Sequence, residues 1–243
     1  MSKRVEHVMG MPVCVEIRTP LPERELVGLL DASFAWLRRV DETFSTYRQD
    51  SQISRLARGE RRTPGPDVEE VLARCAELRE ETGGYFSARA GGTLDPSGYV
   101  KGWAVERLSR ALTSAGALSH CVNAGGDIRV RGSAAPGRPW RIGIRHPRAD
   151  SVCKILFAHD LGVATSGAYE RGTHILDPHT GRPAHGLASV TVTGPDLALA
   201  DAYATAIFAA GRPAFPLPAG YELLLIDETG AATSTAGLSA RAA

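Results

Sequence analysis

Apolar residues recur at three- and four-residue steps in several stretches of the chain, a spacing typical of helices with one buried face. The strongest pattern predicts a helix from Glu23 to about Tyr47. Others are predicted from Pro66 to the Gly83–Gly84 pair, over about 100–115 and over about 199–210. Pro and Gly at the ends of these stretches are ordinary helix boundaries.

Short apolar runs predict strands, the first over residues 13–19. After Gly116 the runs follow one another closely, as HCVNAGGDIRVRG, WRIGIRHP, CKILFAH, SVTVTG and YELLLID, with Gly, Pro and Asp turns between them. Most connections are too short for parallel crossovers, so the sheet should be largely antiparallel. Together with the helices this predicts an α+β fold, in which helices pack on the sheet.

The domain organisation is simple, because the chain shows no repeat of fixed period and no Ser/Gly linker. Residues 1–228 are therefore predicted to form one domain. The remaining segment, 229–243, is TGAATSTAGLSARAA. Its small and polar residues bury little surface, so a disordered tail is expected there.

Composition excludes several classes of protein. The net charge of +1 gives no electrostatic argument for nucleic acid or an anionic membrane as partner. The cysteines form no CxxC pair and are expected to be reduced, mostly packed thiols; they are Cys14, Cys75, Cys121 and Cys153. No signal peptide and no apolar run of membrane-spanning length occurs, which predicts a soluble, cytoplasmic protein.

Two Gly-containing clusters could bind a ligand through the backbone. In TLDPSGYVKGWAVE, Asp95 and Ser97 precede a helix whose first turn holds Lys101, so amides and an ammonium could meet a phosphate there. A capped helix start explains the same spacing equally well. In VNAGGDIRVRG, the glycine pair indicates either a β-bulge or a hairpin.

The richest cluster is VATSGAYERGTHILDPHTGRPAHG, followed by ADAYATAIF. His174, His179 and His185 suggest a metal, but the intervening prolines and glycine forbid a helix that would align them, so zinc is the weaker option. Asp201 and Thr205 stand four apart on a predicted helix and could ligate a hard cation such as Mg²⁺. The alternative is an N-capping Asp and a Thr bonded to its own helix.

Taken in order, these motifs resemble one family. MGMP, STYRQDSQISR, LDPSGYVKGWAVERL, VNAGGDIRV, ATSGAYE, HILDPHTGRP, SVTV and ADAYATAIFAAG are similar to successive blocks of the ApbE-type FAD:protein FMN transferases, from about Met9 to Gly211. The most specific feature is H-I-x-D-P-x-T-G-x-P upstream of A-D-A-x-A-T. The resemblance implies an ApbE-like, T-fold-related architecture.

The resemblance also implies a reaction, the transfer of FMN from FAD to a Thr or Ser hydroxyl of an acceptor flavoprotein, with release of AMP. Mg²⁺, with Mn²⁺ as an alternative, would be bound by the side chains of Asp201 and Thr205 and by backbone carbonyls near Gly98 and Ala204. His174 would take the proton of the acceptor hydroxyl. The FAD site would be lined by Met9, Tyr47, Tyr85, Phe86, Ser87, Asp95, Lys101 and Leu176.

Two departures from the family pattern leave alternatives open. Ser87 in GYFS replaces an acidic residue, and only seven residues, Ala88–Leu94, stand where typical members carry several tens. An FAD pyrophosphatase and a non-catalytic FAD-binding protein are therefore the competing hypotheses. The acceptor Thr or Ser should lie in a motif of small residues. TGAATS in the tail resembles such a motif, although a disordered tail is the favoured interpretation.

Overall fold

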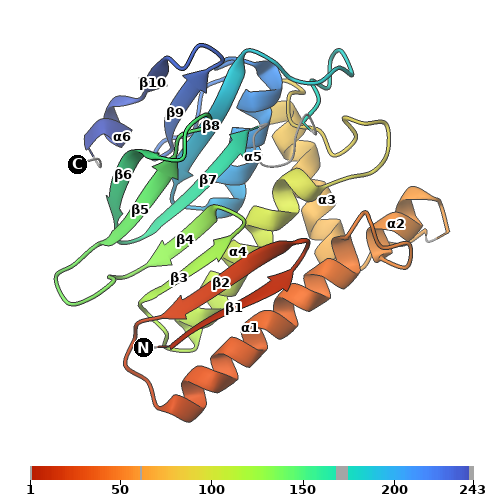
Figure 1. Ribbon diagram of the computed structural model, residues 1–243. Helices are drawn as coiled ribbons and strands as arrows, with labels where there is room; N and C mark the ends of the chain where they lie inside the picture. The colour runs from red at the N-terminus through yellow and green to blue at the C-terminus, as the bar shows by residue number, and fades with distance from the viewer. Residues whose placement is uncertain (1, 61, 168–174, 241–243) are drawn as a thin grey trace.

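The computed structural model describes residues 2–60, 62–167 and 175–240. Within them, eight strands form one antiparallel sheet in the order β1-β2-β3-β4-β7-β8-β9-β10, while β5 and β6 form a separate two-stranded ribbon (Figure 1). The strands are β1 Ser2–Val8, β2 Met11–Ile17, β3 His120–Ala124, β4 Asp127–Arg131, β5 Trp140–Arg145, β6 Val152–Ala158, β7 Leu161–Gly167, β8 Leu187–Gly194, β9 Glu222–Asp227 and β10 Ala232–Ser234. The predicted α+β fold with a largely antiparallel sheet is confirmed.

Helices cover one face of the sheet (Figure 1). They are α1 Glu23–Phe44, α2 Gln52–Ala57, α3 Pro66–Glu81, α4 Ser97–Ser114 and α5 Leu197–Ala210; the small helix α6 Ala236–Ala240 follows β10 and packs on the opposite face. The apolar stripe predicted for α1 is buried, with Phe34 and Leu37 fully inaccessible to solvent. This burial stabilises α1 on the β1–β2 end of the sheet.

Helices α4 and α5 pack tightly together in the middle of this layer. Gly102 on α4 makes the approach possible, because a Cβ there would stand 2.8 Å from Ala198 Cα on α5. Most of α5 is buried, and its many alanines allow it to lie close to both α4 and the sheet. The crossing therefore places polar residues of α4 and α5 next to each other and next to the strands.

The opposite face of the sheet carries a second, smaller core under the β5–β6 ribbon. Trp140 and Ile142 of the ribbon pack with Val163 of β7 and with Leu238 of α6, which is fully buried. The expectation of a disordered tail is thus wrong for residues 232–238. Strand β10 pairs with β9, and one leucine in an otherwise polar segment is enough to dock α6.

Three elements went unrecognised in the sequence. In β1 polar residues point to the helices and Val5 is 57% exposed, so no apolar pattern marks this edge strand. The motif VATSG belongs to β7, a central strand, rather than to a loop. Because α5 packs closely on β7, the strand is built from small and hydroxyl residues and lacks an apolar pattern. A Cβ at Gly162, for example, would lie 2.9 Å from Leu197 Cα. The short α2 has one buried apolar residue, Ile53.

Two further expectations concern the surface. No helix among residues 2–60, 62–167 and 175–240 is long and apolar enough to cross a membrane, and the cytoplasmic location stays a prediction. The four cysteines are free thiols, of which Cys75 is buried and Cys153 exposed. Cys153 therefore differs from the expected packed thiols, because it lies on β6 and faces outward.

Candidate functional site

Two tight hairpin turns lie side by side at one end of the sheet. Met9 and Gly10 join β1 to β2, with φ angles of 55° and 72°, and Gly125 and Gly126 join β3 to β4, with φ angles of 56° and 95°. The glycine pair is thus a hairpin and not a bulge, since a two-residue turn of this type needs positive φ at both positions. The Gly125 amide donates to the carbonyl of Pro12 at 3.2 Å, which joins the two turns.

Asp127 follows the second turn as the first residue of β4 and is fully buried. Its Oδ1 accepts a hydrogen bond from the backbone N–H of Thr165 on β7 at 3.1 Å. Its Oδ2 lies 2.7 Å from the ammonium of Lys101 on α4. Asp127 was not predicted from the sequence. The GGD motif nevertheless carried a signal, since a carboxylate directly after a hairpin turn lies at the end of a sheet, where ligands can approach.

Asp201 on α5 completes this arrangement. Its Oδ2 accepts a hydrogen bond from the Gly102 amide at 3.0 Å, and its Oδ1 lies 3.6 Å from Lys101 Nζ. Burial raises the pKa of Asp201; the Lys101 ammonium acts in the opposite direction, and the Asp127 carboxylate raises it further. Lys101, Asp127 and Asp201, called the Lys101 cluster below, come from α4, β4 and α5.

Thr205 lies one helical turn after Asp201, as the spacing predicted. Its Oγ1 is 3.4 Å from Ser166 Oγ on β7, and Gly98 at the start of α4 is so close that a Cβ there would stand 3.3 Å from Thr205 Cγ2. Ala204 is buried beside it. The resemblance implied that Gly98 and Thr205 act in one site, and the structure places the start of α4 against the middle of α5; their role as metal ligands stays a prediction. Ser166 was not among the predicted residues.

The chemistry of these groups fits a hard cation. Carboxylate and hydroxyl oxygens are ligands that Mg²⁺ accepts, and two carboxylates in the Lys101 cluster outweigh its single ammonium. No group of three or more His, Cys, Asp or Glu side chains that could hold a metal occurs in the described part of the chain. A cation bound here would thus need ligands beyond carboxylates, such as the Thr205 hydroxyl, backbone carbonyls or oxygens of a bound substrate.

A cavity of about 570 Å³ opens between α3, the segment that follows it and the HILDPHTGRP loop. Its lining residues are Leu72, Cys75, Ala76, Arg79, Gly84, Ser87, Ala88, Arg89, Ala90, Leu94, Pro178 and His179. Phe86 is buried beside the cavity, and its ring would meet a Cβ at Gly98 at 3.4 Å. Phe86 therefore connects the cavity with the start of α4.

The segment from Tyr85 to Asp95 forms a compact wall of this cavity. The Asp95 amide donates to the carbonyl of Ala88 at 2.8 Å, so the short stretch closes on itself. Asp95 Oδ1 accepts from the Ser97 amide at 2.9 Å, which forms a turn directly before α4. The N-cap residue of α4, Pro96, makes no side-chain capping bond. Ser87 Oγ accepts from the Arg89 amide at 3.1 Å, so the residue that departs from the family pattern supports the turn and faces the cavity.

The HILDPHTGRP loop is described from Ile175 onward. Leu176 pairs with Pro183 in an isolated bridge, and Leu176 Cδ1 would lie 3.8 Å from a Cβ at Gly91. His179 stacks edge-on against Tyr85, with ring centroids 4.6 Å apart, and its Nε2 lies 3.1 Å from the Gly83 carbonyl. These contacts hold the loop against the wall of the cavity.

The structure brings together most of the residues predicted for binding. Met9 stands in the β1–β2 turn, at the same end of the sheet as Asp127. Lys101 contacts the carboxylates of Asp127 and Asp201. Tyr47 is 95% exposed and does not line the cavity. His174, predicted as the base, lies outside the described residues. The weaker three-histidine metal site gains no support, because His179 contacts Tyr85 and Gly83 instead.

The motifs that build this site match a known family. The model of the ApbE family matches residues 9–93 and 87–217. The chain belongs to the ApbE family. The two matched segments meet at residues 87–93, in the short stretch where the sequence lacks residues typical of other members.

Several curated relatives carry the name FAD:protein FMN transferase. The one from Vibrio cholerae is 39% identical over 130 residues, which are 49% of this chain and 39% of the relative. The one from Rhodobacter capsulatus is 31% identical over 220 residues, 85% of this chain and 40% of the relative. The matched part therefore spans about two fifths of the length of these ApbE-family relatives.

Solved structures agree with the fold over nearly the whole chain. The flavin transferase ApbE from Vibrio cholerae superimposes with a TM-score of 0.82 and 23% identity, covering 99% of both chains. The ApbE protein from Thermotoga maritima gives a TM-score of 0.83 at 23% identity, covering 99% of this chain and 98% of that one. At this identity the likeness establishes the ApbE fold alone.

Proposed function

We propose that this protein transfers FMN from FAD to a Thr or Ser hydroxyl of an acceptor flavoprotein and releases AMP. The observation that carries the proposal is the meeting of the Lys101 cluster and Thr205 at one sheet end, where Gly98 lies between Thr205 and Phe86 and so connects this end with the segment that walls a cavity of about 570 Å³. A nucleotide with a pyrophosphate needs both features, a polar centre for the phosphates and a space for its ring systems. The names of the curated relatives support the same activity.

The proposed reaction breaks a pyrophosphate bond, which requires charge neutralisation and an in-line hydroxyl rather than a covalent enzyme intermediate. Asp201 and Thr205 would hold Mg²⁺, with Mn²⁺ as an alternative, together with backbone carbonyls near Gly98 and Ala204. When bound, the cation would supply positive charge to the phosphoryl oxygens. Asp127 fixes the Lys101 ammonium at 2.7 Å, so a second positive charge stands ready beside the same phosphates.

His174 is the proposed base. A neutral imidazole would accept the proton of the acceptor hydroxyl at its unprotonated ring nitrogen as the hydroxyl oxygen bonds to phosphorus and the bond to AMP breaks. The acceptor hydroxyl should lie in a segment of small residues, since a bulky neighbour would keep it from the phosphate. Ser87 at the cavity wall, in place of an acid, removes a negative charge from the nucleotide site.

The decisive experiment incubates the protein with FAD, Mg²⁺ and candidate acceptor proteins, and follows both AMP release and the mass of the acceptor peptide. We expect a mass increase equal to FMN and AMP release that depends on the acceptor. AMP release without acceptor would identify an FAD pyrophosphatase instead. FAD binding with no AMP release under any condition would identify a non-catalytic binding protein.

His174→Ala sharpens this experiment. A general base typically contributes 10²–10⁴-fold to the rate, so the variant should bind FAD normally and lose most of its transfer activity. Binding is measured by the fluorescence anisotropy of FAD, and transfer by the mass of the acceptor. His185→Ala is the matched control, because it removes an imidazole from the same region without a proposed role. Equal transfer by the wild type and His174→Ala would remove His174 from the mechanism.

A further inference from the structure

A second ion pair connects the elements that carry the Lys101 cluster. Glu106 lies five residues after Lys101 on α4, and Arg129 lies two residues after Asp127 on β4. Arg129 Nε is 3.0 Å from Glu106 Oε2, and the side chains are 0% and 4% exposed. Arg129 is among the largest fully buried side chains described. A charged pair this deep cannot meet a substrate directly.

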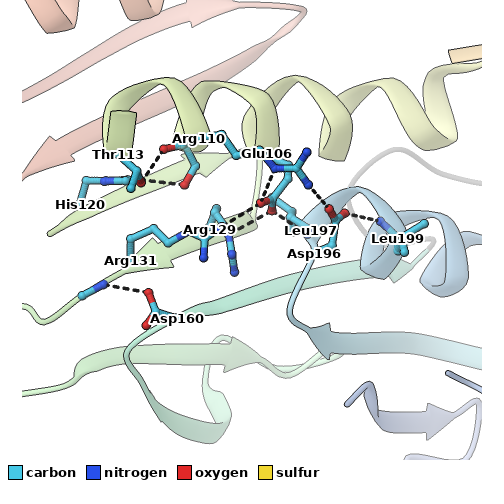
Figure 2. Close-up of polar contacts among 12 residues, drawn as sticks. Glu106, Arg110, Thr113, His120, Arg129, Arg131, Asp160, Asp196, Leu197 and Leu199 are labelled. Atoms are coloured by element: carbon cyan, nitrogen blue, oxygen red, sulfur yellow. Dashed lines mark hydrogen bonds and ion pairs between the residues drawn. The ribbon is translucent and has the colours of Figure 1, made fainter. Parts of the chain in front are cut away.

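The third element, α5, is joined to the same pair (Figure 2). Glu106 Oε2 accepts a hydrogen bond from the backbone N–H of Leu197, the first residue of α5, at 2.9 Å. Asp196, directly before it, caps the helix through Leu199 N and lies 2.6 Å from Arg110 of α4. Glu106 thus connects α4, β4 and α5, which also contribute one residue each to the Lys101 cluster.

The Lys101 cluster depends on the spacing of these three elements. Lys101 must reach a carboxylate on β4 at 2.7 Å and another on α5 at 3.6 Å, while the Gly102 amide meets Asp201 at 3.0 Å. A shift of α4 relative to α5 by about 1 Å would break the Gly102 hydrogen bond and displace a proposed cation ligand. The Glu106–Arg129 pair opposes such a shift, because separating buried opposite charges is costly.

We propose that Glu106 and Arg129 are positioning residues for the cation and phosphate site. They fix α4, β4 and α5 at the spacing at which Asp201 can bind a divalent cation and Lys101 can face the pyrophosphate. This inference rests on the proposed function. It predicts that loss of the pair raises the Mg²⁺ concentration needed for FAD binding, without any direct contact between the pair and either ligand.

The test uses the double variant Glu106→Gln/Arg129→Met. Removing both charges together leaves neither residue as an unpaired buried charge. Arg131 and Arg110, which also lie near Glu106, are 28% and 64% exposed and so keep contact with water. Gln keeps an oxygen that can accept from Leu197 N. FAD binding is followed by fluorescence anisotropy during a Mg²⁺ titration, with thermal melts of each sample. We expect the Mg²⁺ concentration for half-maximal FAD binding to rise about 10-fold while the protein remains folded.

Val130→Ala is the matched control. Val130 is the neighbour of Arg129 on β4 but faces the second core under the ribbon, so its truncation lowers stability without touching the pair. It should leave the half-maximal Mg²⁺ concentration unchanged. An equal shift in this control and in the double variant would show a general effect of stability and overturn the positioning role, as would an unchanged midpoint in the double variant.

The single variant Arg129→Lys adds an independent measurement if the double variant folds poorly. Lysine keeps the positive charge but lacks the planar guanidinium, so the Mg²⁺ midpoint should lie between those of the wild type and the double variant. A midpoint equal to that of the wild type would count against the proposal. Absence of Mg²⁺-dependent FAD binding in the wild type itself would refute the proposed function rather than the positioning role alone.

Discussion

The Lys101 cluster and the Glu106–Arg129 pair are built from the same three elements and the same kinds of side chain, yet they differ in access. The side chain of Lys101 is 22% exposed, although its partners Asp127 and Asp201 are buried, whereas Arg129 and Glu106 are both enclosed. Ion pairs that a ligand can reach are available for chemistry. Those enclosed by packed residues can act only through the positions of other groups.

Energetics should separate the two regions as well. A charge that is partly exposed keeps some hydration, so its substitution costs little stability, whereas a buried charge that loses its partner costs several kcal/mol. Substitutions in the enclosed pair should thus appear first in stability. Those in the Lys101 cluster should appear first in the handling of FAD and Mg²⁺.

The largest expected effect is on the stability of Arg129→Met. The substitution removes from Glu106 its one wholly enclosed cation while Arg131 stays at 3.1 Å, so the loss should be about 3 kcal/mol, the lower end of the cost of breaking a buried pair. Urea denaturation followed by circular dichroism measures the free energy of unfolding. The control is Arg131→Met, because Arg131 also contacts Glu106, at 3.1 Å, but is 28% exposed; it should lose less than about 1 kcal/mol. Equal losses in the two variants would contradict the contrast between enclosed and accessible charges.

The next effect concerns Mg²⁺ and the accessible region. Asp201→Asn keeps the volume of the side chain but removes a carboxylate ligand, so the Mg²⁺ concentration needed for FAD turnover should rise about 100-fold. Thr205→Val should raise it about 10-fold, because a neutral hydroxyl contributes less than a carboxylate. Thermal melts should stay near the wild type, since burial already disfavours the charged form of Asp201. A wild-type Mg²⁺ requirement in Asp201→Asn, or a collapse of its melting temperature, would assign Asp201 a structural role.

A smaller effect is expected from pH in the enclosed region. Burial lowers the pKa of His120 to about 4, and Ser109 Oγ lies 2.8 Å from its Nε2. The unfolded chain therefore binds a proton between about pH 6.5 and 4 that the folded state excludes. The stabilisation is complete above pH 6.5 and is lost as the pH falls toward 4, by about 2 kcal/mol at pH 5. Urea denaturation of the wild type and of His120→Gln, each at pH 7 and pH 5, measures this loss of stability. Equal pH dependence in the two proteins would exclude His120 as its source.

The sequence predicted the accessible region better than the enclosed one. Asp and Thr at helix starts carry recognisable motifs, so Lys101, Asp201 and Thr205 were candidates from the residues alone, and the resemblance added Gly98. The structure brings these residues together, and their roles stay predictions. Periodicity likewise predicted the long helices α1, α3, α4 and α5. Asp127 was missed only because its motif, GGD, equally describes an ordinary hairpin turn.

The enclosed pair could not be predicted, because nothing local distinguishes it. Arg129 lies in DIRVRG, where alternation with Ile and Val is typical of a half-exposed strand with Arg toward water. Only the long-range contact with α4 shows that this face of β4 is covered. The order of residues 232–238 could not be predicted for a similar reason, since a few apolar residues suffice to pack a short segment on an existing core.

The smallest effect, none at all, is expected at the tail. TGAATS resembles an acceptor motif, but Thr233 lies in β10, the edge strand next to β9, where it pairs with Leu225. The following segment is also fixed, because the Thr235 hydroxyl accepts from the Leu223 amide at 3.0 Å and Leu238 is buried. Transfer needs a hydroxyl in line with the phosphate, and a strand residue bound in this way would have to detach first. The intact mass of the protein should stay unchanged after incubation with FAD and Mg²⁺, with Thr233→Val as the control. A gain of one FMN by the wild type but not by this variant would show that the tail leaves the sheet and reaches the accessible region.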